Sequence, residues 1–474
     1  MTAFCLNAVA CAAHDARSDA VTYNTNNFII MIYSSLNHAL RVPLAAEVHS
    51  RPYLRLDAPE SLTHLAVYAR DDVSPNVSNQ ARQHAILSEL CKHFGVTAPG
   101  VDAKYFFHDF GRFRLKWECH TEFATYTFAE QHAENPSIEE AFEHVPLFHL
   151  PQEWLMGLQG KIMVAAHVVL DKTRGPVDAF ARGLRRVFEG NNLVGSQVLQ
   201  GGEVWTDFLI QSDGFSRFVV RDVGLQEQQA GRLVQRLLEI ETYRMMSLLG
   251  LPHAQRATPV LNTIEGELAT LTEAMVNTSG GTQLSDTDDE QALLGNITGL
   301  AARIEKLSLA NSYRFSASKA YFGLVHARIE ELREARIEGF PTVGEFMDRR
   351  LTPAMHTCEA VTRRQEALAE RIAHTNDLLR TRVGIVQEKQ NRQILETMNA
   401  RAAQQLRLQQ AVEGLSVVAI SYYTAGLFSY IGKAAKAVGW PVNPDISTGL
   451  LLPLIAAGVW LGLRRMHKSI HHAA

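Results

Sequence analysis

Two groups of polar side chains near the start of the chain are of types that do chemistry. The first lies in HALRVPLAAEVHSRPYLRL (residues 38–56), where Glu47, His49 and Arg51 follow one another closely. Carboxylates and imidazoles are common metal ligands, and a guanidinium can clamp a phosphate with paired hydrogen bonds. The spacing matches no established ligand rule, and Pro52 favours an extended or turning backbone. The alternatives are a metal or anion site and a helix cap with surface ion pairs.

The second polar group lies within RFRLKWECHTEFATYTFAE (residues 112–130), where apolar and polar residues alternate. This period of two is typical of a strand whose neighbouring side chains point to opposite faces. One face then carries Arg112, Arg114, Lys116, Glu118, His120 and Glu122. Such a charged face is commonly the solvated one. The alternative is a polar pocket or docking face, with Trp117, His120 and Glu122 as its candidate residues.

Stronger signals of catalysis are missing from the sequence. It contains no GxGxxG, GxxxxGK(S/T), GxSxG, HExxH or HRD motif. The five cysteines lack CxxC spacing, which argues against a zinc site and is typical of a reducing compartment. A formal net charge of -4 gives no basic field for nucleic acid. We therefore assign no catalytic residue, cofactor, metal or small-molecule substrate, and an enzyme is the less favoured class.

The elements that must position these residues form an α+β region. Residues 1–30 are predicted to be a disordered tail, and residues 31–224 a mixed α/β cytoplasmic domain. A strand-like segment (63–70), a helical segment (80–95) and alternating segments (105–130) are followed by a similar order from Lys161 onward. The order looks duplicated, although no repeat is visible at the level of residues.

From residue 225 the pattern becomes helical, and residues 225–411 are predicted to form a helical domain and stalk. Gly and Pro interrupt it near 250 and 340, and the acidic segment 279–290 is expected to be a loop. The last helix has no Pro between about 359 and 410, so it is too long to bury itself against one small domain. We expect it to pack against earlier helices or against copies of itself in a homo-oligomer, as a helical bundle or coiled coil.

The same helical pattern continues into an uncharged stretch without a break. Residues 412–432 are predicted to be a first transmembrane helix, 433–445 an outer loop and 446–463 a second transmembrane helix. A basic cytoplasmic tail, 464–474, follows. Basic residues at both outer ends outweigh the two lysines of the loop, so the positive-inside rule places both termini in the cytoplasm. The lipid bilayer is thus the expected partner.

Polar residues along the stalk offer another interpretation. Asn391, Asn399, Gln404 and Glu413 precede or enter the first apolar stretch. They are candidate pore-mouth residues if the chain forms a channel. The same polar stripe is equally expected at an oligomeric helix interface.

Several blocks of the sequence resemble a known bacterial family. They are HALRVPLAAEVHSRPYLRL, RFRLKWECHTEF, EIETYRMMSLLGLP, RFSASKAYFGLV, EFMDRRLTPAMHTCEA and the run from LLRTRVGIVQEK to VVAISYY. Together they are similar to DUF3422, a family of membrane-anchored proteins of unknown function, over about residues 36–470. The resemblance implies a multi-pass anchor in the bacterial inner membrane and no established activity.

The layout alone is also similar to that of CorA-type magnesium channels, which are pentamers. That family carries Gly-Met-Asn after its first span, whereas the loop here reads KAAKAVGWPVNPD. We therefore expect an oligomeric, membrane-anchored scaffold or regulator that faces the cytoplasm. A CorA-like ion channel and an enzyme at the membrane surface are the alternatives.

Overall fold

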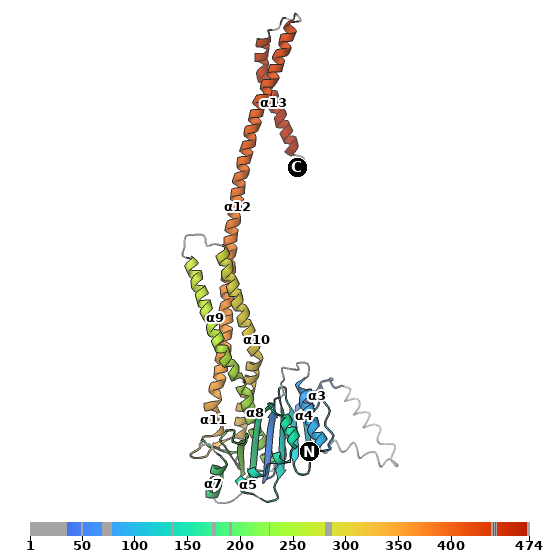
Figure 1. Ribbon diagram of the computed structural model, residues 1–474, viewed down its shortest axis with the longest axis vertical. Coiled ribbons are helices and arrows are strands. Elements are labelled where there is room, and N and C mark those ends of the chain that lie inside the picture. The colour runs from blue at the N-terminus through green and yellow to red at the C-terminus, as the bar shows by residue number, and fades with distance from the viewer. Residues whose placement is uncertain are drawn as a thin grey trace, which may run out of the picture. The chain divides into compact units, whose positions relative to one another are not determined.

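The computed structural model describes residues 36–48, 51–68, 78–134, 136–172, 177–188, 192–226, 228–279, 287–437, 439, 441 and 443–471. The chain divides into two compact units. The first comprises Met1–Gly266 and Arg303–Ala369, and the second Glu267–Ala302 and Glu370–Ala474. Figure 1 labels their elements.

The first unit is built on a nine-stranded sheet with the order β2-β3-β4-β1-β5-β8-β7-β6-β9. Its strands are β1 (Glu60–Val67), β2 (Tyr105–Asp109), β3 (Arg114–Cys119), β4 (Ala124–Gln131), β5 (Ile162–Asp171), β6 (Val194–Val198), β7 (Gly202–Thr206), β8 (Ser216–Asp222) and β9 (Ala335–Arg336). β5 and β8 pair in parallel, and the other neighbours pair in antiparallel fashion. The fold is therefore a mixed α+β fold, as the sequence predicts.

Helices precede, connect and follow these strands. They are α3 (Arg41–Val48), α4 (Asn79–His93), α5 (Ile138–Glu143), α6 (Gln152–Gly157), α7 (Val177–Val187), α8 (Gln229–Leu248), α9 (Gly250–Ser279), α10 (Thr287–Leu332), α11 (Val343–Arg350), α12 (Thr352–Ala437) and α13 (Pro444–His471). A short 3-10 helix covers Pro146–His149. Pro252 does not stop a helix but lies in the first turn of α9, where its missing N–H has no helical partner to lose.

The duplicated order seen in the sequence recurs in space, but the strand directions differ. β1 lies beside β4, then β3 and β2, while β5 lies beside β8, then β7 and β6. However, β4 runs antiparallel to β1, whereas β8 runs parallel to β5. A true repeat keeps its strand directions, so the two halves of the sheet are not copies of one fold.

Both faces of the sheet are covered, which makes all eight residues of β1 buried. On one face α8 packs through Leu233 and Leu237 against a core that includes Leu62 and Phe218. On the other face α4 and α6 cover Leu65, Trp117 and Tyr126. Polar side chains that point at α8 are therefore inside the protein and need partners there.

The polar segment 112–130 is two strands and not one. β3 ends at Cys119, and a turn closed by a hydrogen bond from His120 N to Phe123 O (2.8 Å) leads into β4. The alternation changes phase across this turn, because the residues that face α8 are even-numbered on β3 (Lys116, Glu118) and odd-numbered on β4 (Thr125, Thr127). Glu122 therefore lies in the turn, whereas Lys116 and Glu118 lie on β3.

The boundary expected at residue 225 does not separate the two units. α8, α11 and part of α10 belong with the sheet, because Val325, Leu332 and Val343 complete the core beneath α8. β9 also adds to the sheet beside β6. The apolar faces of these helices would otherwise be exposed to water. They therefore pack against the sheet, although its other strands lie far away in the sequence.

Candidate functional site

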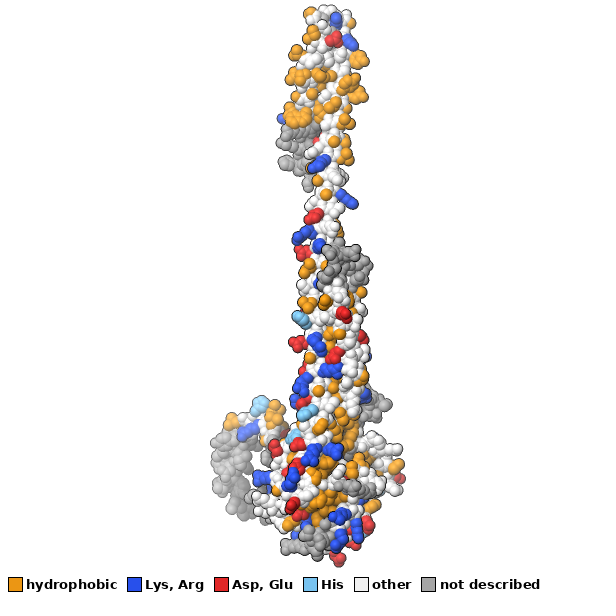
Figure 2. Space-filling model, turned by 90° about the vertical axis from the view of Figure 1, so that its left-hand side faces the viewer, with side chains coloured by type: hydrophobic (Ala, Val, Ile, Leu, Met, Phe, Trp, Pro, Cys, Tyr) orange, Lys and Arg blue, Asp and Glu red, His pale blue; other side chains and the backbone are white. Residues whose placement is uncertain are grey.

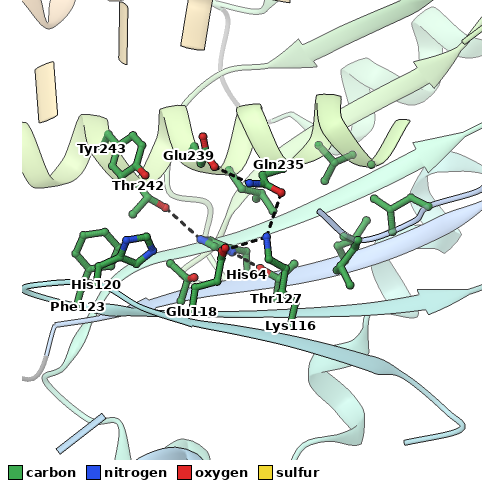
Figure 3. Close-up of a pocket in the computed structure, with 17 residues that line it drawn as sticks. His64, Lys116, Glu118, His120, Phe123, Thr127, Gln235, Glu239, Thr242 and Tyr243 are labelled. Carbon is green, nitrogen blue, oxygen red and sulfur yellow. Dashed lines mark hydrogen bonds and ion pairs between the residues drawn. The ribbon is translucent and has the colours of Figure 1, made fainter. Parts of the chain in front are cut away.

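A small polar cavity lies between α8 and the sheet. Figure 3 shows Thr242 and Gln235 pointing from α8 toward the strands of the opposite wall, with Glu239 and Tyr243 of the same helix beside them. From the sheet side come His64, Lys116, Glu118, His120, Phe123, Thr125 and Thr127. Its volume is about 40 Å³, enough for about three water-sized spheres. Ions and very small molecules fit this space, and nucleotides do not.

Strand register brings the sheet residues of the cavity together. Lys116 lies opposite Thr127, and Glu118 lies opposite Thr125, in the β3–β4 pair. His64 lies opposite Thr127 on the other side of β4. Residues that pair across antiparallel strands share a face, so all of these side chains point toward α8.

Gly231 sets how closely α8 approaches. A Cβ atom at this position would lie 1.9 Å from the carbonyl oxygen of Leu54, which is far inside van der Waals contact. Only glycine lets the helix backbone come this close to the segment before β1. Both residues line the cavity, so its height is determined by backbone contact.

A chain of hydrogen bonds and ion pairs connects the buried Lys116 to α10. Its ammonium group forms an ion pair with Glu118 (3.1 Å) and donates a hydrogen bond to Gln235 (3.1 Å), and Gln235 in turn donates to Glu239 (2.8 Å). Glu239 accepts a hydrogen bond from Arg328. Only 4% of the Lys116 side chain is exposed. A charge at this depth is stable only with such partners, which also fix its position.

The two histidines of the cavity are held neutral. Burial lowers the pKa of His64 to about 3, and the positive charge of Lys116 acts in the same direction. Its ring nitrogens lie 2.8 Å from the Thr127 hydroxyl and 3.1 Å from the Thr242 hydroxyl, so one nitrogen donates and the other accepts. Burial likewise lowers the pKa of His120 to about 3, with Arg51 as the next contribution. Neither ring is a positive charge at neutral pH.

We expect the unfolding free energy to fall as the pH drops below 6.5, because of His64. The unfolded chain binds a proton near pH 6.5, whereas the folded chain does not until about pH 3. The stabilisation that comes from neutral His64 is therefore complete above pH 6.5, and about 2 kcal/mol of it is lost by pH 5. Urea unfolding at pH 7 and pH 5, compared with a His64→Gln variant, measures it. An equal pH dependence in both proteins would contradict the assignment.

The residues singled out in the sequence lie in three different places. Glu47 is at the surface, where it accepts a hydrogen bond from Lys104 (2.9 Å) and lies 3.9 Å from Arg51. The Arg51 guanidinium donates to the carbonyl of Cys119 (3.2 Å), which brings its charge close to His120. Trp117 points to the opposite face of the sheet, into the core under α4 and α6. His49 lies outside the described residues.

Glu122 is engaged in a buried ion pair. Its carboxylate oxygens accept hydrogen bonds from Arg314 of α10 at 2.8 and 3.0 Å. Of the five candidates that the structure describes, only His120 lines the cavity. The side chains that complete the cavity come from α8, more than 100 residues later, and α8 carries no chemical motif that marks them. The only sequence feature that pointed to them was the polar face of β3, because a polar face that does not meet water must be covered by another element.

The four stalk candidates lie on α12 in the second unit. At 3.6 residues per turn, Asn391, Asn399 and Glu413 fall within an arc of about 80°, whereas Gln404 lies on the other side of the helix. The three amides are exposed, and Glu413 is partly buried. The four side chains thus do not form a single stripe. In the described part of the chain, no three His, Cys, Asp or Glu side chains are grouped to hold a metal ion.

At the C-terminus, two helices are long and apolar enough to cross a membrane. One apolar window lies in the helical region Val343–Ala437, and the other is Asp445–Gly462; 11% and 0% of them are buried. Figure 2 shows the apolar side chains gathered over the end of α12 and over α13, where charged side chains are few. In a water-soluble core helix such side chains are buried.

The fold thus defines a mixed α+β protein with two C-terminal helices of membrane-spanning length and composition. Within that class the chain belongs to the DUF3422 family, described as protein of unknown function, whose model matches residues 36–470. No curated protein sequence matches the chain. A solved structure described as that of the full-length CmaX protein has 13% sequence identity, covering 64% of this chain and 89% of that chain. Its TM-score is 0.16, so this likeness supports no conclusion about fold or function.

Proposed function

We propose that the chain is a membrane-anchored protein of the bacterial inner membrane, with residues 412–432 and 446–463 as its two spans. The observation that carries this proposal is the exposure of their apolar side chains. Leu415, Tyr422, Leu427, Leu450 and Leu454 are between 64% and 75% exposed. Water is an unfavourable surrounding for such a surface, and hydrocarbon is a favourable one.

The side-by-side course of the two helices supports a hairpin. α13 lies beside the end of α12 in Figure 1, within the second unit. Ser421 and Ala425 are the buried residues of the first span, at 7% and 6% exposure. Small residues four apart let two membrane helices approach closely. The basic residues at both outer ends support a topology with both termini and the sheet on the cytoplasmic side.

A homo-oligomer accounts for the exposed part of α12 that precedes the membrane. Ile394, Met398, Leu406 and Leu408 are between 55% and 67% exposed, although they precede the first span. A single helix in water gains little stability from its own hydrogen bonds and needs an apolar face to be packed. A second copy of α12 offers the same apolar face, so we propose self-association here. The proposed role is that of a scaffold or regulator at the membrane.

Cysteine labelling in intact spheroplasts tests this topology. With Cys5 and Cys11 replaced by serine, the remaining cysteines of the chain are buried: Cys91, Cys119 and Cys358. We expect an impermeant maleimide to label an Asn443→Cys variant in the outer loop. A matched Glu388→Cys variant on the cytoplasmic side should react only after permeabilisation. Labelling of both positions under the same condition would contradict the two-span arrangement.

A further inference from the structure

The stretch 391–412 of α12 is exposed on every side. Each of its residues is helical and exposed, and the first proposed span follows directly. At 1.5 Å per residue the stretch is about 33 Å long. A lone helix in water is only marginally stable, and most helices in proteins are stabilised by packing along one face. The order of side chains around the helix shows which face that is.

Uncharged residues repeat along one face of this stretch at alternating steps of four and three. We call this face the seam, and its residues are Asn391, Leu395, Met398, Ala402, Gln405, Gln409 and Val412. The steps average 3.5 residues, which is the period that keeps one face turned toward a partner helix over several turns. All four charged residues of the stretch lie off the seam, namely Arg392, Glu396, Arg401 and Arg407. The pattern is therefore that of a face that packs against another helix.

Three residues of the seam carry side-chain amides, which restricts the partner. Asn391, Gln405 and Gln409 each have N–H donors and a carbonyl acceptor, and packing against another helix removes them from water. An apolar partner would leave these groups unpaired, which is costly. An identical residue supplies both the donor and the acceptor that each amide needs, and polar residues at such positions fix the register of paired helices.

The membrane anchor determines the direction of a second copy. The seam ends at Val412, where the first proposed span begins, so each seam residue lies at the same distance from the bilayer in every copy. Two copies with the same topology therefore present α12 in the same direction and at the same height. The bilayer also confines both copies to a surface, which raises their effective concentration. A partner from solution is under neither constraint.

We propose that the seam binds the seam of a second copy of this chain, in parallel and in register. This pairing rests on the proposed membrane anchor and self-association, and it specifies the direction of the helices and the residues in contact. Asn391, Met398 and Gln405 then each meet the same residue of the second copy.

Disulfide cross-linking of the full-length protein in native membranes tests this pairing. In the Cys5→Ser/Cys11→Ser background, the variants Asn391→Cys, Met398→Cys and Gln405→Cys are each oxidised briefly and separated on non-reducing gels. Helices with axes about 8–10 Å apart bring the Cα atoms of facing residues to about 4–6 Å, a distance that a disulfide can bridge. All three variants should therefore give a covalent dimer.

Ala400→Cys is the matched control, since Ala400 is exposed and lies about 160° around the helix from Met398. In the same pair of helices its two Cα atoms would be about 13–15 Å apart, which is beyond the reach of a disulfide. Cross-linking should be at least about tenfold slower than in Met398→Cys. Equal rates in these two variants would overturn the seam. Cross-linking at only one of the three seam positions would overturn the parallel register, because crossed or antiparallel helices meet at one height.

The oligomeric state separates this pairing from the proposed function. Met398→Lys places like charges against each other in the seam, so this variant should sediment as a smaller species than the native protein in detergent, whereas Ala400→Lys should not. A monomeric native protein would overturn self-association and the seam together. A membrane-bound oligomer in which no seam position cross-links would overturn the seam alone.

Discussion

Removal of residues 412–474 is expected to move the protein from the membrane fraction to the soluble fraction. The deleted segment contains both apolar windows, in which 11% and 0% of the residues are buried. Covering one Leu, Val or Phe side chain with hydrocarbon contributes about 1.5–3 kcal/mol, and the segment holds many of them. Ultracentrifugation of cell lysates, with and without carbonate washing, measures the change. Retention of the shortened protein in the membrane after washing would contradict the anchor.

Full-length variants control for damage caused by the truncation. Leu427→Arg and Leu454→Arg each place a charge near the middle of one window, at a cost of about 2.5–3.5 kcal/mol for insertion. Together they should weaken membrane retention. Arg substitutions at the exposed Leu406, before the first span, should leave it unchanged.

The soluble fragment also tests self-association. Sedimentation should show that a fragment ending at residue 411 is larger than a monomer. A fragment ending at residue 383 lacks Ile394, Met398 and Leu406 and should be monomeric. Equal stoichiometry of the two fragments would assign self-association to another part of the chain.

Replacement of Arg314 by methionine is expected to lower the unfolding free energy of the sheet unit by about 3–5 kcal/mol. The Arg314 and Glu122 side chains are only 7% and 4% exposed, and two hydrogen bonds join them. Removal of one partner leaves a buried charge without compensation, which is the costly case. Urea unfolding of the soluble fragment, followed by the fluorescence of buried Trp117 and Trp154, measures the loss.

Two further variants show whether burial is the cause. A Glu122→Leu/Arg314→Met double variant should recover much of the loss, because apolar side chains can replace a buried pair at little cost. Arg392→Ala removes an exposed pair with Glu388, whose side chains are 71% and 75% exposed, and should cost at most about 0.5 kcal/mol. Similar losses in Arg314→Met and Arg392→Ala would contradict this explanation.

Local patterns were enough to predict the classes of element but not their partners. The alternation around Lys116 and the uncharged runs after Glu413 are patterns that can be recognised within a single strand or helix. The strand ends were less clear, although the polar positions change from even-numbered on β3 to odd-numbered on β4, which marks the hairpin at His120–Phe123. The match to DUF3422 over residues 36–470 was recognised from separate blocks of sequence.

The cavity could not be predicted in full because its walls are distant in the sequence. Lys116 meets Gln235 across 119 residues, and His64 meets Thr242 across 178. A strand pattern cannot say whether a charged face meets water or a helix, and here it meets α8. Thr125 is polar like its neighbours, and only the three-dimensional contacts distinguish its unpaired hydroxyl from the paired one of Thr127.

The contact between Gly231 and Leu54 has a consequence for the size of the cavity. A wall made of side chains can adapt to a larger guest by rotating about a few bonds, but two touching stretches of main chain cannot. Additional room would require α8 to move away as a rigid rod and to break its ion pairs to α10, Glu239 with Arg328 and Arg236 with Glu331. The distance between α8 and the segment before β1 is thus fixed by main chain, and the hydrogen atom of Gly231 in place of a methyl group allows it.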